Sequence, residues 1–131
     1  MKPHAFSLDE ANALIPDLER RFEELQALQQ RAEELEASIE NLVERDRSNG
    51  RNHGEEIAQL EGEIERVVTR TNQIIDEISD LGCEIKDIEQ GLVDFPSERE
   101  GRLVYLCWKL GEDRIRFWHE LTSGYAGRQP L

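Results

Sequence analysis

The stretch Ile57–Leu81, IAQLEGEIERVVTRTNQIIDEISDL, has the most regular apolar pattern in the chain. An α-helix has 3.6 residues per turn, so spacings that alternate between three and four residues place side chains on one helical stripe. Gly82 follows directly, in the position where a glycine commonly ends a helix. The pattern therefore predicts one continuous helix, whose stripe consists of Ile57, Leu60, Ile64, Val67, Thr71, Ile74, Ile78 and Leu81.

A second stripe precedes this helix and predicts a partner for it. Its spacing also alternates between three and four residues, with one extra step of three at Leu25–Leu28. Between the two stripes, residues 45–54 (RDRSNGRNHG) contain no apolar side chain and predict a turn. Two helices of similar length joined by a short turn fold back as an antiparallel hairpin. The upstream stripe consists of Leu18, Phe22, Leu25, Leu28, Ala32, Leu35, Ile39 and Leu42.

The N-terminal segment predicts one further short helix. Ser7-Leu8-Asp9-Glu10 fits a capping box, in which the serine hydroxyl and the glutamate carboxylate each bind a free backbone N–H at the start of a helix. Pro16 lacks an N–H and its ring clashes with the preceding turn, so a helix is expected to break there. We expect a short helix over 8–15, with Pro16 in the first turn of the long helix that follows.

The last fifty residues predict a small antiparallel β module. Leu103–Trp108 is the clearest strand, because β-branched and aromatic residues are concentrated in it. Pro96 is expected to close the strand before it, and the tail from Thr122 is expected to be irregular but packed. The fold class is therefore mainly α (α+β), with the β module capping the open end of the hairpin. The other predicted strands are Cys83–Ile88, Leu92–Phe95 and Arg114–His119.

Charge and aromatic content both change near Gly82, which indicates two modules, 1–81 and 82–131. Residues 1–81 contain 20 acidic and 9 basic side chains, whereas residues 82–131 contain 9 and 7. Six of the eight aromatic residues lie in the second part. We therefore expect the residues with chemical function in the aromatic β module rather than in the acidic hairpin.

Composition excludes several classes of partner. A formal net charge of −13 disfavours nucleic acid, because a phosphate backbone would be repelled by most of the chain. No apolar run approaches the roughly 20 residues that span a membrane, and the N-terminus does not resemble a secretory signal. Two cysteines are too few for a disulfide scaffold. We expect a cytoplasmic protein with no nucleic-acid or membrane partner.

The polar residues of the β module are the candidate site. His119 with the carboxylates Asp94 and Glu112 could bind a divalent metal ion such as Fe, Mn or Zn. Alternatively, a ligand site could hold a small anion through the guanidinium of Arg128. The residues assigned to that ligand site are Arg128, Trp108, Trp118 and Asp87.

A purely structural interpretation of the same residues stays open. Arg128 could pair with a carboxylate and hold the tail, and His119 could bond only to the backbone. Cys107 is expected to be buried and inert, and both tryptophans could belong to the core. The tip arginines could contact an acidic partner or could simply be solvated; they are Arg45, Arg47 and Arg51.

Several motifs together resemble a bacterial family known only as the domain of unknown function 2203 family. The resemblance spans nearly the whole chain and implies a small cytoplasmic bacterial protein. It supplies no activity, substrate or site residues. The motifs are residues 6–12 (FSLDEAN), residues 91–96 (GLVDFP), residues 104–108 (VYLCW) with Gly111-Glu112, and Trp118-His119 with Gly127-Arg128.

Three functional hypotheses follow. The first is a non-enzymatic binding or interaction protein, with a ligand or metal pocket where the β module meets the helices. The second is a small metal-dependent enzyme that uses His119 and nearby carboxylates; the absence of phosphate-loop, zinc-finger and HExxH patterns weakens it. The third is a structural homodimer joined along its helices. A protein partner, a small anionic ligand and a divalent metal cofactor are therefore the candidates to test.

Overall fold

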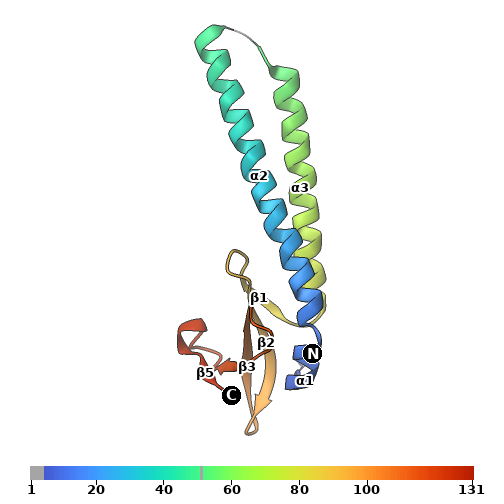
Figure 1. Cartoon of the computed structure of the whole chain (residues 1–131), viewed down its shortest axis with the longest axis vertical. Coiled ribbons are helices and arrows are strands. Elements are labelled where there is room, and N and C mark those ends of the chain that lie inside the picture. Colours follow the sequence, from blue (N-terminus) through green and yellow to red (C-terminus); the bar gives the residue numbers. More distant parts are fainter. Residues whose placement is uncertain (1–4, 51) are drawn as a thin grey trace. The chain divides into compact units, whose positions relative to one another are not determined.

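The computed structural model describes residues 5–50 and 52–131. The chain divides into two compact units, which are considered separately. Unit 1 combines residues up to Glu23 with Ile75–Leu131, and unit 2 is Glu24–Ile74. Figure 1 labels the elements, which are α1 (Leu8–Ala13), α2 (Ile15–Asn49), α3 (Gly54–Asp80), β1 (Glu84–Asp87), β2 (Leu92–Arg99), β3 (Arg102–Lys109), β4 (Phe117–His119), the 3-10 helix η1 (Tyr125–Gly127) and β5 (Gln129–Pro130).

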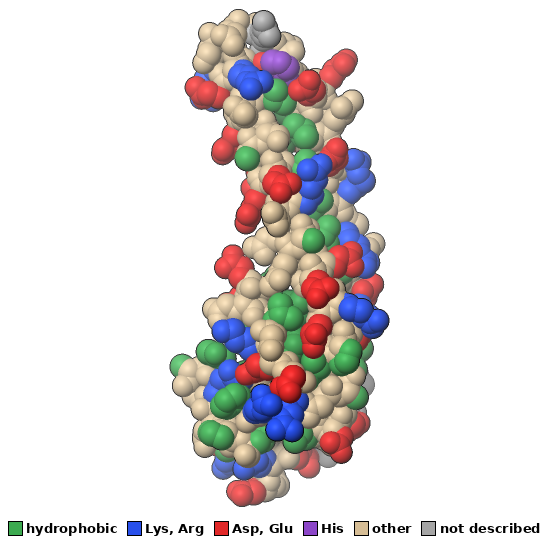
Figure 2. Space-filling view, in the orientation of Figure 1, with side chains coloured by type: hydrophobic (Ala, Val, Ile, Leu, Met, Phe, Trp, Pro, Cys, Tyr) green, Lys and Arg blue, Asp and Glu red, His purple; other side chains and the backbone are tan. Residues whose placement is uncertain are grey.

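Unit 2 contains most of the predicted helical hairpin, formed by the parts of α2 and α3 that lie between Glu24 and Ile74. The apolar stripes of the two helices face each other, and Leu25, Leu35 and Ile74 are almost fully buried. Ion pairs cross between the helices: Arg70 binds the Glu24 carboxylate through two nitrogens, at 2.7 and 3.0 Å. Such exposed pairs add little stability, so burial of the stripes is the main source of cohesion. The space-filling view shows the charged side chains spread along the hairpin (Figure 2).

The turn of the hairpin is shorter than the ten residues predicted. Helix α2 continues to Asn49 and α3 begins at Gly54, so Arg45 and Arg47 lie in the last turns of a helix. Polar residues do not stop a helix whose end faces solvent, which explains the difference. Asp46 accepts a 2.9 Å hydrogen bond from the backbone N–H of His53 and also pairs with its ring. The predicted tip residue Arg51 lies outside the described residues.

The predicted capping box and the position of Pro16 are confirmed in unit 1, and the short helix ends two residues before its predicted end. Ser7 caps α1 and Glu10 returns its carboxylate to the Ser7 N–H, so both halves of the capping box are present. Helix α1 ends at Ala13, and Pro16 is the second residue of α2. Proline is tolerated there because the first N–H groups of a helix have no intrahelical partner.

None of the helices in the described part of the chain is long and apolar enough to cross a lipid bilayer.

The β module is a five-stranded antiparallel sheet in which each strand pairs with the next along the chain. Strand β2 continues through Pro96 to Arg99, beyond the predicted end. The Pro96 carbonyl accepts a 2.7 Å hydrogen bond from Phe6, on the side away from β3. In an antiparallel strand a residue's nitrogen and carbonyl point to the same side, so the missing N–H of Pro96 removes no bond to β3.

A two-residue turn sets the register between β2 and β3. Glu100 and Gly101 both have positive φ, 53° and 78°, as a type I′ turn requires. The pairing Arg99↔Arg102 at this turn places Asp94 opposite Cys107, five residues further along each strand from the turn. The register between β3 and β4 places Tyr105 opposite His119.

The two faces of the sheet have different partners within unit 1. On one face Trp108 lies against Phe22 of α2, with ring centroids 6.1 Å apart, and Phe95 lies edge-on against Phe6 at 5.3 Å. Side chains alternate between faces along a strand, so the neighbours of these core residues belong to the opposite face. Asp94 and Cys107 are such neighbours.

The compact units do not coincide with the compositional change at Gly82. Unit 1 contains the beginning of α2 and the end of α3 as well as the sheet. Phe22 and Ile78 are fully buried in this unit, so the helix ends supply part of the core on which the sheet folds.

Replacing Leu35 by aspartate tests the hairpin. Leu35 is 1% exposed, so its substitution places a carboxylate in an apolar stripe, and we expect a loss of at least about 3 kcal/mol in the free energy of unfolding. The same change at Val68, which is 49% exposed on α3, serves as the control and should cost less than about 1 kcal/mol. Chemical denaturation followed by circular dichroism measures both. Equal effects would contradict the assigned stripe.

Replacing Glu100 by asparagine tests the turn. Glutamate is strained at positive φ, whereas asparagine tolerates it, so this substitution should raise the free energy of unfolding by about 0.5–1 kcal/mol. Glu98→Asn removes the same charge from the regular part of β2 and should not stabilise the protein. A loss of stability in Glu100→Asn would show that the turn does not have the assigned geometry.

Candidate metal centre

Three buried side chains from three adjacent strands converge on the sheet face opposite Trp108. They are Asp94 of β2, Cys107 of β3 and His119 of β4. One carboxylate oxygen, the thiol sulfur and one imidazole nitrogen all lie within 4.8 Å of one another. The exposed fractions of the three residues are 3%, 1% and 2%. Such a grouping of buried polar side chains needs a partner or a ligand to offset the loss of water.

The arrangement follows from strand register. Asp94 and Cys107 are opposite each other on β2 and β3, so their side chains share a face. Cys107 and Tyr105 are two residues apart on β3 and therefore point to the same face. Tyr105 is opposite His119 on β4, and the two rings pack with centroids 5.4 Å apart. The face shared by these four residues is consequently determined once the two registers are set.

The orientation of His119 identifies its tautomer. Its Nδ1 lies 2.7 Å from the backbone carbonyl oxygen of Glu120. A carbonyl oxygen only accepts, so Nδ1 must donate and holds a proton. In a neutral imidazole this leaves a lone pair on Nε2, directed into the cluster. Metal-binding histidines commonly have this arrangement, with the distal N–H held by a backbone carbonyl.

Nε2 of His119 faces the carboxylate of Asp94 without bonding to it. The Nε2–Oδ2 distance is 2.9 Å, yet Nε2 is buried and has no hydrogen-bond partner among the described residues. A hydrogen bond needs a suitable direction as well as a short distance, so the 2.9 Å separation alone does not pair the two groups. A neutral imidazole would therefore present its lone pair beside a negative oxygen. This contact becomes favourable when one cation is bound by both atoms, or when the imidazole is itself protonated.

Cys107 completes the cluster as a thiol. Burial, followed by the nearby Asp94 charge, raises the pKa of Cys107 to about 12, so the metal-free side chain is protonated at neutral pH. A bound divalent metal would reverse this balance, because a coordinated thiol is deprotonated. The atoms that share a tetrahedral Zn²⁺ lie roughly 3.3–3.6 Å apart when metal–ligand distances are about 2.0–2.3 Å. The three donor atoms lie within 4.8 Å of one another, and Nε2 and Oδ2 are 2.9 Å apart, so small side-chain adjustments would bring all three to metal-binding distances.

A cavity of about 250 Å³ adjoins the cluster, and all three side chains line it. Tyr105 forms another part of its wall and hydrogen-bonds Glu84, which raises the pKa of Tyr105 to about 12 and lowers the pKa of Glu84. Lys86 lies at the exposed rim, with its ammonium 5.1 Å from the Tyr105 ring centroid. The remaining wall residues are Leu92, Leu121, Thr122, Gly124 and Tyr125.

Glu112, a predicted metal ligand, does not reach the cluster. Both of its carboxylate oxygens bind Nη2 of Arg128, at 3.0 and 2.8 Å, and one also accepts the N–H of Lys109 at 2.7 Å. Arg128 lies over the rings of Phe117 and Tyr125, at 4.0 and 4.7 Å from their centroids. These contacts agree with the structural interpretation of Arg128, in which the guanidinium pairs with a carboxylate and holds the tail in place. Arg128 Nε is buried without a hydrogen-bond partner among the described residues.

The other residues predicted for a ligand site lie apart from the cavity. Trp108 is fully buried against Phe22 and donates its Nε1–H to the Glu112 carbonyl at 3.0 Å. Trp118 is covered by the guanidinium groups of Arg99 and Arg102. Asp87 closes the turn after β1 by accepting the Gln90 N–H at 3.1 Å. Of the seven residues assigned to metal or ligand sites, the structure brings together Asp94 and His119.

Cys107 is the member of the cluster that sequence reasoning missed. Its burial is as predicted, but its position opposite Asp94 could not be derived because β2 was expected to stop at Pro96. The sequence signal that could have located Cys107 is the Glu100-Gly101 turn. If β2 is taken to continue past Pro96 to this turn, the turn sets the β2–β3 register and places Cys107 opposite Asp94. The cluster also lies on the face away from Phe22, whereas the sequence predicted a pocket where the β module meets the helices.

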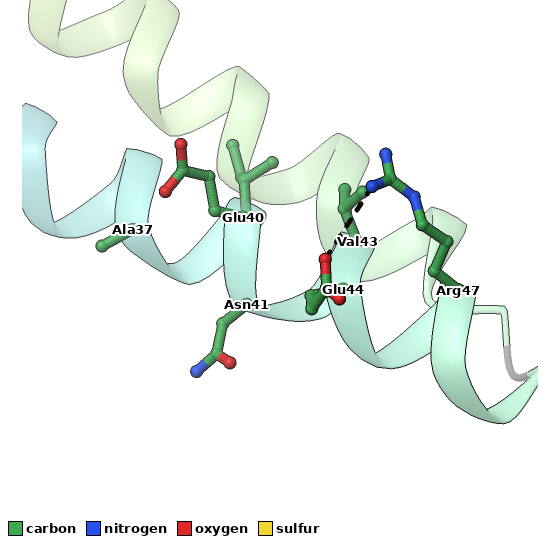
Figure 3. Close-up of a pocket in the computed structure, with 7 residues that line it drawn as sticks. Ala37, Glu40, Asn41, Val43, Glu44 and Arg47 are labelled. Atoms are coloured by element: carbon green, nitrogen blue, oxygen red, sulfur yellow. Dashed lines mark ion pairs between the residues drawn. The ribbon is translucent and has the colours of Figure 1, made fainter.

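A different hollow lies along the exposed side of α2, and Figure 3 shows it in close-up. It has a volume of about 570 Å³, and all of its lining residues come from this one helix. Arg47 pairs there with Glu44 at 3.8 Å, and both side chains are about 70–75% exposed. The hollow contains no cluster of buried polar groups, so the β-sheet cluster remains the candidate site.

A family model described as "Uncharacterized conserved protein (DUF2203)" matches residues 4–131. No curated protein and no solved structure is significantly similar to the chain.

Replacing Glu112 by glutamine tests the structural role of the Arg128 pair. Arg128 and Glu112 side chains are 12% and 22% exposed, so removing the negative charge leaves a mostly buried guanidinium unpaired. We expect a loss of about 2–4 kcal/mol in the free energy of unfolding. Asp113→Asn, the control, disrupts the exposed Arg116 pair and should cost less than about 1 kcal/mol. Similar small losses in both variants would rule out a stabilising role for the Glu112 pair.

Proposed function

The chain belongs to the uncharacterised conserved protein family DUF2203, and we propose that it binds a divalent transition metal ion through Asp94, Cys107 and His119. The observation that supports this most directly is the state of His119. Its Nδ1 proton is held by a backbone carbonyl, while the buried Nε2 faces a carboxylate without a hydrogen bond. The same arrangement orients histidine in many metal sites.

The donor atoms favour zinc over the hard cations. A thiolate and an imidazole are poor ligands for Mg²⁺ and Ca²⁺, which prefer oxygen alone. One sulfur, one nitrogen and one oxygen are all common Zn²⁺ ligands. With the cysteine and aspartate ionised, the two negative charges balance the metal, so a buried zinc site would be electrically neutral.

A simple ion pair between Asp94 and a protonated His119 is the main alternative. It accounts for the 2.9 Å distance between the two side chains. It does not account for the absence of a hydrogen bond at the buried Nε2, because an imidazolium N–H beside a carboxylate is expected to donate one. In that alternative Cys107 is a thiol that hydrogen-bonds Asp94, whereas in the proposed metal site its sulfur is a ligand.

A small metal-dependent enzyme is the second candidate function. The observation that favours it is the cavity of about 250 Å³, which reaches all three proposed metal ligands. Catalytic zinc sites commonly combine three protein ligands with a position for water or substrate. A cytoplasmic location, a homodimer and a protein partner of the hairpin remain predictions from the sequence.

Zinc titration of the purified protein tests the proposal. We expect one zinc ion per chain, and a loss of at least about tenfold in affinity in Asp94→Asn, Cys107→Ser and His119→Ala. His53→Ala and Cys83→Ser are matched controls: they remove a histidine and a buried cysteine outside the cluster and should retain zinc. Competition with a chromophoric chelator measures affinity, and circular dichroism establishes that each variant is folded.

Cobalt substitution provides a second readout that does not depend on stability. A cobalt–thiolate charge-transfer band should appear in the wild-type protein and in Cys83→Ser, and be absent from folded Cys107→Ser. The proposal fails if wild-type protein binds less than about one zinc per ten chains at saturating metal. It also fails if the control variants lose the metal as completely as the cluster variants.

A further inference from the structure

We infer that a metal ion held by Asp94, Cys107 and His119 keeps an open coordination position, which takes a small anionic oxygen ligand of the carboxylate or phosphate class. Lys86 lies at the cavity rim, where its ammonium would attract that ligand. This inference rests on the proposed metal function. It adds the chemical class of the molecule that the site accepts.

The first step is that the cluster supplies three ligands where a closed zinc site needs four. Within the described residues, the cluster contains one aspartate, one cysteine and one histidine. Structural zinc sites are closed by four protein ligands, whereas sites with three leave a position for water or another molecule. The fourth position must therefore be filled from the cavity or from a neighbouring side chain.

The second step is that the neighbouring carboxylates are engaged elsewhere. Glu112 is bound to Arg128 and to the Lys109 N–H. The carboxylate of Glu120 lies 2.6 Å from Arg102, which leaves only its backbone carbonyl for His119. None of these acidic groups lines the cavity. Among the described residues, a fourth carboxylate ligand from Glu112 or Glu120 would require its ion pair to break.

The third step concerns the size of the cavity and the residues that line it. Its volume of about 250 Å³ exceeds that of a single water, whose share of liquid volume is about 30 Å³. Asp94, Cys107 and His119 form one part of the wall. Thr122 also lines the cavity, and a threonine hydroxyl is a suitable hydrogen-bonding group for a ligand with several oxygen atoms.

The fourth step is charge. A divalent metal bound by one carboxylate and one thiolate has no net charge left to attract a distant anion. Among the cavity-lining residues that the structure describes, Lys86 supplies the positive charge. Its ammonium pairs with Glu84 at 3.2 Å, and both side chains are about 43–45% exposed. An exposed pair of this kind is weak, so the flexible lysine can turn toward a bound anion.

Titration of the cobalt-loaded protein with acetate, and separately with inorganic phosphate, tests the inference. Constant ionic strength, maintained with sodium perchlorate, removes general salt effects. We expect a saturable change in the visible cobalt bands with at least one of the two anions. A response to acetate alone assigns the carboxylate class, and a response to phosphate alone assigns the phosphate class.

The variant Lys86→Gln tests the role of the rim lysine. It should weaken anion binding by about tenfold, while leaving cobalt affinity and the anion-free spectrum unchanged. Lys109→Gln makes the same charge change outside the cavity lining and should alter anion affinity by less than about twofold.

The outcomes separate this inference from the proposed function. Absence of cobalt binding would overturn both. Cobalt binding without any spectral response to acetate or phosphate would overturn the open position and leave the metal site intact. An unchanged anion affinity in Lys86→Gln would overturn the assigned role of Lys86.

Discussion

The register of the β2–β3 hairpin is the constraint on which the candidate site depends. A tight turn at Glu100-Gly101 aligns the two strands, and this alignment puts Asp94 opposite Cys107. A shift of one residue would send one of the two side chains to the core face, against the helices. The strain of a glutamate at positive φ is tolerated because burial of one face of the sheet specifies the register strongly. Strand β4 then adds His119 through its pairing with Tyr105.

The cluster also shows how a small protein can hold polar groups away from water. The core face of the sheet is apolar and packs on helix ends in unit 1. The other face is covered partly by the C-terminal segment, which Arg128 holds through Glu112 and two aromatic rings. Here the ion pair and the cluster have separate roles: the first attaches the tail, and the second leaves buried donor atoms beside a cavity. Polar residues that look alike in the sequence therefore differ in what they can do.

The predicted elements and the predicted site differ in how well the sequence located them. The capping box, the position of Pro16 and the apolar stripes of the hairpin were predicted, because each depends on residues within a few turns of one helix. The tip was predicted too long, since solvent-facing helix ends accept polar residues. For the site, Asp94 and His119 were predicted as metal ligands and lie together, whereas Glu112 pairs with Arg128 instead. Cys107 was predicted to be buried and inert, and its placement beside Asp94 was not anticipated.

The sequence alone determined the helical hairpin and the presence of an antiparallel β module, because hydrophobic periodicity, caps and turn residues act over short distances along the chain. Only the tertiary structure decided which polar side chains of that module meet. Cys107 is thirteen residues from Asp94 and twelve from His119, and their convergence depends on two strand registers and on a strand that continues through Pro96. Such contacts form between separate segments, so no local pattern specifies them, and a one-residue change in register would separate the three side chains.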